Sequence, residues 1–229
     1  MDDFGKNTAS IPNRAADYLV NWIMENGLKP GDKIPTELEL TKILNVGRSS
    51  VREAIAILKS KNIVEVRRGC GTFLSESPGQ VEDPLGLNFI QNRRQLALDW
   101  GIVRMIIEPS IAELAAIHAT DEEVEELDYW NRQVEVNIAE GVSHLEADLR
   151  FHALLASATH NMVVDKLMPI INEGIDRFMS SADDNASAES RHWHYKIMDA
   201  VRAHDAAAAK CAMEMLLCVN QERLRNHFE

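Results

Sequence analysis

A mainly α-helical chain in two parts is the fold class that this 229-residue sequence predicts. The first part combines short helical patterns with a glycine-punctuated β-hairpin. The second part shows helical periodicity alone and is expected to form an all-α bundle of about six to seven helices. Turn residues without apolar periodicity separate the two parts. The predicted divisions are a disordered N-terminal arm (1–11), the helix-and-hairpin domain (12–75), a linker (76–94) and the helical domain (95–229).

The first helix is expected from Pro12 to Met24, with an apolar face that includes Leu19 and Ile23. A second short helix begins after Thr36, whose side chain can cap it. Glu39 lies three residues further on, which is the spacing of a capping box.

A third helix is predicted after the break at residues 45–47. Its apolar positions Val51, Ile55 and Leu58 recur at helical spacing and are expected to face inward. Arg48 and Arg52 are four residues apart, so they project from one face near the N-terminus of the helix. This is the pattern of a helix-turn-helix recognition helix, whose N-terminal residues reach base edges in the major groove.

A basic-tipped hairpin follows the third helix. Residues 63–66 alternate like a short strand, and residues 67–71 turn the chain into a second strand at 72–74. Gly69 and Gly71 permit positive φ and let the backbone approach a phosphate or a minor groove closely. The three helices and the hairpin together predict a winged helix-turn-helix domain. The alternative is a small helical domain with a solvated basic face.

The segments PTELELTKIL, GRSSVREAIAILKSKNIVEV and RRGCGTFL resemble the winged helix-turn-helix of the GntR superfamily of bacterial transcription regulators. Two residues depart from the pattern. Gly47 stands where many members have Ser or Thr, and Leu38 stands where some have a DNA-contacting arginine, so fewer contacts are expected. The resemblance implies that the wing enters the minor groove and that the operator contacts are Thr36, Arg48, Ser49, Ser50, Arg52, Arg68 and Gly69.

The distribution of charge agrees with DNA binding, although the chain as a whole has a net charge of −12. Residues 1–77 have 11 Lys and Arg against 10 Asp and Glu, whereas residues 78–229 have 13 against 26. Local positive charge drives binding to phosphates, so the acidic remainder does not cancel a basic patch. The predicted partner is a pseudo-palindromic double-stranded DNA operator bound by a homodimer, because one recognition helix reads only a few base pairs.

The second part resembles the FadR-type effector domain of the same superfamily, often called FCD. The resemblance rests on Arg104 with Glu108, on EADLRFH and ATHN between residues 146 and 161, and on His194. It is closest to sugar-acid regulators such as galactonate repressors. The helices are expected at Gln95–Ala119, which includes Ile102 and Ile106 among its apolar positions, and at Asp121–Ala139, Ser143–Thr159, Met162–Ser180, Ala188–Ala203 and Asp205–Arg225.

Asp148 and His152 are spaced i, i+4, so they point from one helix face toward the same place and provide half of a divalent metal site. The family often adds two further histidines. One matches His194, and the other falls on Leu216, which cannot ligate a metal. The resemblance therefore implies a divalent cation, with Zn²⁺ as the first candidate, held by three residues and the effector. In the alternative, no metal binds, and Asp148, His152 and His194 hydrogen-bond the hydroxyl groups of the ligand.

Arg104 is predicted to bind the carboxylate of a small acid effector, because a guanidinium group pairs with a carboxylate through two hydrogen bonds. The alternative is that Arg104 pairs with Glu108, one turn away, at the surface. Asn161 is expected to cap the following helix.

These observations predict a ligand-responsive regulator, most simply a repressor of a sugar-acid operon that a small carboxylate releases from DNA. The alternatives are an effector that is another hydroxy acid or a short carboxylate and, more remotely, a metal-dependent enzyme acting on a small acid. No catalytic nucleophile–base set is visible, so no enzyme is expected. No apolar run approaches 18 residues and no signal-peptide pattern occurs, which predicts a cytoplasmic location. Cys211 and Cys218 are expected in the core rather than in a disulfide.

Overall fold

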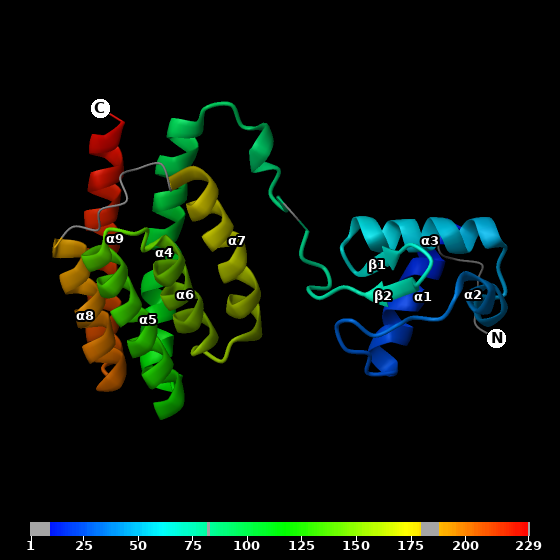
Figure 1. Cartoon of the computed structure of the whole chain (residues 1–229), viewed down its shortest axis with the longest axis horizontal. Coiled ribbons are helices and arrows are strands. Elements are labelled where there is room, and N and C mark those ends of the chain that lie inside the picture. The colour runs from blue at the N-terminus through cyan, green and yellow to red at the C-terminus, as the bar shows by residue number, and fades with distance from the viewer. Residues whose placement is uncertain (1–9, 82, 180–187, 229) are drawn as a thin grey trace. The chain divides into compact units, whose positions relative to one another are not determined.

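The computed structural model describes residues 10–81, 83–179 and 188–228. The chain divides into two units, residues 1–85 and 86–229, and the division falls within the segment predicted as a linker. Figure 1 shows short helices with a hairpin in the first unit and a bundle of long helices in the second. The predicted fold class is therefore confirmed. The predicted disordered arm lies outside the described residues except for Ser10, which caps the first helix, and Ile11, which begins it.

The first unit consists of three helices around one apolar core. The side chain of Thr36 accepts a hydrogen bond from the backbone of Glu39, and the Glu39 side chain bonds back to Thr36, so the predicted capping box is present. Val51, Ile55 and Leu58 are buried, as their spacing predicted. The helices are α1 (Ile11–Glu25), α2 (Glu37–Leu44) and α3 (Arg48–Ser60).

The hairpin pairs β1 (Val64–Arg67) with β2 (Gly71–Leu74) in antiparallel register. Leu74 is opposite Val64, and both side chains are buried in the core of the first unit. The turn opposite this buried end carries the exposed Arg68 and Gly69. The predicted wing is therefore anchored by its base and exposed at its tip.

Among the described residues, the second unit has six α-helices and one short 3₁₀ helix, η1 (Leu87–Phe89). Figure 1 shows the helices packed along one another, and no strand is described in this unit. The apolar core draws on all six helices. They are α4 (Arg93–His118), α5 (Asp121–Glu140), α6 (Leu145–Ser157), α7 (Met162–Met179), α8 (Ala188–Arg202) and α9 (Ala206–His227).

Helix α4 is central in this unit, because it contacts α6, α7, α8 and α9. Two glycines permit the close approach of its neighbours. A Cβ atom at Gly101 would collide with Gln221 of α9, and one at Gly174 of α7 would collide with Trp100 of α4. The Trp100 indole donates a hydrogen bond of 3.0 Å to the carbonyl of Ile171, which also fixes α7 against α4.

The expected core position of Cys211 and Cys218 was wrong. Both are free and exposed, because the buried face of α9 runs through Ala212, Met213 and Leu216 instead. The apolar residues Ile102 and Ile106 are exposed on α4, although they share a helix with the buried Ile111. In contrast, Asn161 caps α7 as predicted, since its side chain accepts from the backbone of residues 163 and 164. Within the described ranges, no helix is both long and apolar enough to cross a membrane.

Candidate functional site

The residues predicted to contact DNA lie on the surface of the first unit. Arg48 and Ser49 are exposed in the first turn of α3, Ser50 is half-buried beside them, and Arg52 is exposed one turn further on. Gly47 precedes the helix without a side-chain cap, so the first backbone N–H groups of α3 have no side-chain acceptor at that position. Such N–H groups favour a phosphate oxygen.

Arg52 and Thr36, two of the predicted DNA contacts, each interact with a glutamate of α2. The Arg52 Nε atom lies 4.0 Å from the carboxylate of Glu37 at the start of α2, and both side chains are largely exposed. The Thr36 hydroxyl donates a bond of 2.7 Å to Glu39, and together with the Thr36 backbone N–H this lowers the pKa of the Glu39 carboxyl. Thr36 is therefore engaged in the helix cap, while its exposed position leaves it accessible to DNA.

The tip of the wing is exposed to solvent, and no other described part of the unit packs against Gly69. Gly69 has φ of +76°, and a Cβ atom there would meet no heavy atom within 4 Å. The adjacent Arg67 lies over the Phe73 ring, 4.6 Å from its centre, and also pairs with Glu65. Arg67 is thus held on the hairpin, whereas Arg68 and Gly69 are the exposed groups at its turn.

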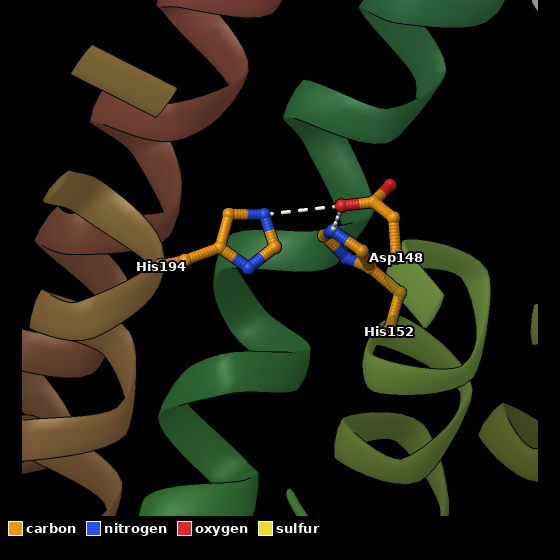
Figure 2. A group of neighbouring side chains, drawn as sticks. All are labelled: Asp148, His152 and His194. Atoms are coloured by element: carbon orange, nitrogen blue, oxygen red, sulfur yellow. Dashed lines mark ion pairs between the residues drawn. The ribbon is translucent and has the colours of Figure 1, made fainter. Parts of the chain in front are cut away.

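In the second unit, Asp148 and His152 of α6 and His194 of α8 lie together (Figure 2). The Asp148 Oδ1 atom is 3.1 Å from His194 Nε2 and 3.8 Å from His152 Nε2. Both histidines are buried, with exposed fractions of 2% and 5%. The i, i+4 spacing brings Asp148 and His152 together locally, and the packing of the bundle adds His194.

Two charged residues of α4, Glu108 and Arg104, contact His152. The His152 Nδ1 atom is 2.8 Å from Glu108 Oε2, and the Glu108 carboxylate pairs with Arg104 at 2.6 and 3.2 Å. The Arg104 Nη2 atom is also 3.5 Å from His152 Nε2. The pairing of Arg104 with Glu108 that had been considered as an alternative is therefore present, but it is buried against the histidine cluster rather than at the surface.

The surroundings keep both carboxylates ionised. Burial alone raises the pKa of Glu108, but the charges of Arg104 and His152 outweigh it and lower that pKa to about 2. Burial likewise opposes ionisation of Asp148, and His152, His194 and Arg104 outweigh it, so the pKa of Asp148 lies well below its usual range. Ionised carboxylates are the form that binds a cation.

This set of donor atoms fits a divalent cation. One ligand atom from each of Asp148, His152 and His194 lies within 4.8 Å of the other two. Tetrahedral Zn²⁺ at about 2.1 Å from each ligand would place neighbouring ligand atoms ~3.4 Å apart, so side-chain shifts of about 1 Å would bring the three atoms into range. If His152 Nε2 bound a metal, the Glu108 carboxylate at Nδ1 would be the group that orients the ring. Leu216, where the resemblance expects a fourth ligand, is fully buried in the apolar core and offers no ligand atom.

A polar cavity of about 60 Å³ lies beside Asp148 and His194. His144, Arg191 and Arg223 also line it, and none of these three basic residues was predicted from the sequence. His144 lies four residues before Asp148 and Arg191 three residues before His194, so helical spacing could have indicated these two. Arg223 of α9 and the contact of Glu108 with His152 involve separate helices, which local spacing does not relate.

Comparison with known proteins assigns both units. The profile of bacterial regulatory proteins of the gntR family matches residues 12–74, and that of the FCD domain matches residues 102–217. The Uxu operon transcriptional regulator of Escherichia coli K12 is 32% identical over 83% of this chain and 77% of its own. LutR, an HTH-type transcriptional regulator of Bacillus subtilis, is 30% identical over 90% of this chain and 98% of its own.

A solved structure described as Streptococcus agalactiae GntR superposes with a TM-score of 0.86. It is 36% identical to this chain and covers 92% of it, with 99% of its own length aligned. Taken with the two profile matches, this similarity shows that the chain belongs to the GntR family of bacterial transcription regulators, with an FCD effector domain as its C-terminal unit.

Proposed function

We propose that this regulator represses a sugar-acid catabolic operon and that a small carboxylate, bound in the FCD domain, releases it from DNA. The observation that carries the proposal is the buried cluster of Asp148, His152 and His194 in a chain whose other unit exposes Arg48 and Arg52. Similarity to a Uxu operon regulator and to the repressor NanR of Enterobacter, 30% identical over 89% of this chain, supports the same function.

In this proposal, Asp148, His152 and His194 hold a divalent cation, with Zn²⁺ as the first candidate. When bound, the cation supplies an electrophilic anchor for the oxygen atoms of the acid. Because Leu216 provides no ligand, a coordination position is left for the effector. Arg104, whose Nη2 atom lies 3.5 Å from His152 Nε2, contributes positive charge next to the site. It is the proposed partner of the effector carboxylate.

Two alternatives concern the ligand. Without a cation, Asp148, His152 and His194 would hydrogen-bond the hydroxyl groups of the effector directly. The effector could also be another hydroxy acid or a short carboxylate, since the same donors recognise any acid that has a neighbouring hydroxyl group. A metal-dependent enzyme acting on a small acid is the remaining candidate. The coordination position left by Leu216 is its sole support, and membership of a regulator family favours regulation.

The proposed assembly is a homodimer in the cytoplasm, bound to a pseudo-palindromic operator. Ile102, Met105 and Ile106 form an exposed apolar strip on α4 and are the proposed contact between the two copies. Effector binding must favour one placement of the winged domains over another. A coupling of about 1–3 kcal/mol changes operator affinity by roughly 5- to 150-fold.

A screen of thermal unfolding with galactonate, lactate and citrate, each with and without Zn²⁺, tests the ligand class. Galactonate with Zn²⁺ is expected to raise the melting temperature most and to weaken binding to the DNA upstream of the protein's own gene. Stabilisation by lactate or citrate but not by galactonate would contradict the sugar-acid assignment. Turnover of any of these acids would favour the enzyme.

A further inference from the structure

The polar cavity beside the histidine cluster has nitrogen atoms on its wall for which the described residues provide no hydrogen-bond partner. Within the described part of the chain, three side-chain nitrogens on its wall are buried without a hydrogen-bond partner: His144 Nδ1, Arg191 Nε and His194 Nδ1. The Arg191 Nε–H is always a donor, and each histidine Nδ1 is a donor when it carries the ring proton, so an acceptor that enters this cavity gains partners that the described residues do not occupy.

His194 Nδ1 is one of these unpartnered atoms, and its role depends on what binds the other ring nitrogen. Its Nε2 atom faces the Asp148 carboxylate at 3.1 Å, where the proposed cation would bind. When Nε2 binds a metal, the proton of the neutral ring is on Nδ1, which becomes a donor. His152 has Glu108 as the acceptor for that proton, but no described residue serves His194 in the same way. Within the described residues, His194 Nδ1 is therefore left for an acceptor that enters the cavity.

The charges on the wall identify the class of acceptor. Arg191 and Arg223 line the cavity from α8 and α9. The Glu135 carboxylate lies 3.6 Å from Arg191 Nη1, and Arg191 Nε has no partner among the described residues. Asp148 also lines the cavity, but its charge is directed to the two histidines. Two guanidinium groups on the wall, one of them with an unpartnered Nε–H, are the groups that bind a carboxylate or a phosphate, so the cavity favours an anion.

We infer that this cavity is a subsite for a second anionic group of the effector, bound by Arg191 and Arg223, so that diacids are preferred over monoacids. The inference rests on the proposed function and specifies its ligand: one carboxylate lies at the Asp148, His152 and His194 site, and the other acidic group lies in the cavity. A carboxylate and a phosphate share the chemistry that two arginines recognise, so either group could fill the subsite.

Calorimetric titration of the full-length protein with Zn²⁺ tests the inference with two matched pairs of acids. Galactarate differs from galactonate by a second carboxylate, and 6-phosphogluconate differs from gluconate by a phosphate. We expect at least one diacid to bind ten times or more tighter than its monoacid. A preference within the first pair identifies a carboxylate subsite, and a preference within the second identifies a phosphate subsite. Equal affinities within both pairs would overturn the inference.

Substitutions of Arg191 and Arg223 test whether these two residues cause the preference for diacids. Arg191→Gln and Arg223→Gln should reduce the diacid preference to about twofold or less, with monoacid affinity unchanged. Arg191→Lys, which keeps the charge, should retain part of it. Arg132→Gln removes an exposed arginine of α5 that pairs with Asp128, and it should keep the full preference. A preference that survives both Gln substitutions would overturn the assignment.

The outcome separates the inference from the proposed function. If galactonate binds and weakens operator binding but no diacid binds tighter, the subsite is wrong and the proposed function stands. If none of the four acids binds, both are wrong. Operator affinity of each variant serves as the check on folding.

Discussion

His152 Nδ1 lies 2.8 Å from Glu108 Oε2, and each of these side chains is 1% exposed. The contact joins α6 to α4 and directs the other ring nitrogen of His152 toward Asp148. Arg104 is paired with the same Glu108 carboxylate. Arg104, Glu108, His152 and Asp148 therefore form one chain of contacts, in which the loss of one group leaves its neighbour without that partner.

Glu108→Gln tests this network. The substitution leaves Arg104 buried without its counter-charge, which is expected to lower the free energy of unfolding by about 3 kcal/mol. Zn²⁺ affinity should fall about 10- to 100-fold, because His152 loses its orienting carboxylate. Urea unfolding and zinc titration measure the two effects.

The matched control is Glu113→Gln, which removes a similar pair with Lys210 at the surface of the same helix. Since exposed ion pairs contribute about 0–1 kcal/mol, this variant should be close to wild type in both measurements. Equal effects of the two substitutions would argue against the network.

Leu216→His places a histidine at the position where the family resemblance expects a fourth ligand. Leu216 is one helical turn before Asn220, which lines the cavity beside Asp148 and His194. A histidine there is expected to raise Zn²⁺ affinity at least tenfold in a competition titration with a chelator, since a fourth ligand completes the tetrahedral set. Unchanged affinity would show that position 216 does not reach the metal.

Arg48→Ala and Arg52→Ala test the recognition helix. Each variant should weaken binding to the operator by about 1–3 kcal/mol in a gel shift, as the loss of a base-contacting arginine does. The control is Arg132→Ala in the second unit, which should bind as wild type. If both α3 variants bind the operator undiminished, α3 is not the recognition helix.

Ile106→Asp tests the proposed dimer contact. Ile106 is 71% exposed on α4, so a charge at this position costs the monomer little but disrupts an apolar interface. Sedimentation should show a monomer at concentrations where the wild type is a dimer. Val136→Asp, on the exposed face of α5, should leave the dimer intact.

Local sequence spacing correctly predicted the contacts between residues three or four positions apart in one helix. The capping box of Thr36 and Glu39 and the shared face of Asp148 and His152 both follow from helix geometry and were found as expected. His194 is 42 positions beyond His152, so spacing alone could not place it, and its prediction came from family resemblance. A similar separation of 44 positions hid the contact between Glu108 and His152.

Burial was harder to predict than helix position. The apolar pattern of α4 identified a helix, but it did not reveal that Ile102 and Ile106 would remain exposed while Ile111 is buried. Periodicity describes one helix at a time, whereas the covered face depends on where its neighbours pack. Cys211 and Cys218 were assigned to the core for the same reason and lie on the uncovered face of α9.

The central claim is that an acid bound at the histidine cluster weakens operator binding. Fluorescence anisotropy of labelled operator DNA, measured with Zn²⁺ and increasing galactonate, tests it in wild type and His194→Gln. The account predicts that both proteins bind the DNA equally well and that galactonate releases only the wild type. Release of both proteins at the same galactonate concentration would contradict it.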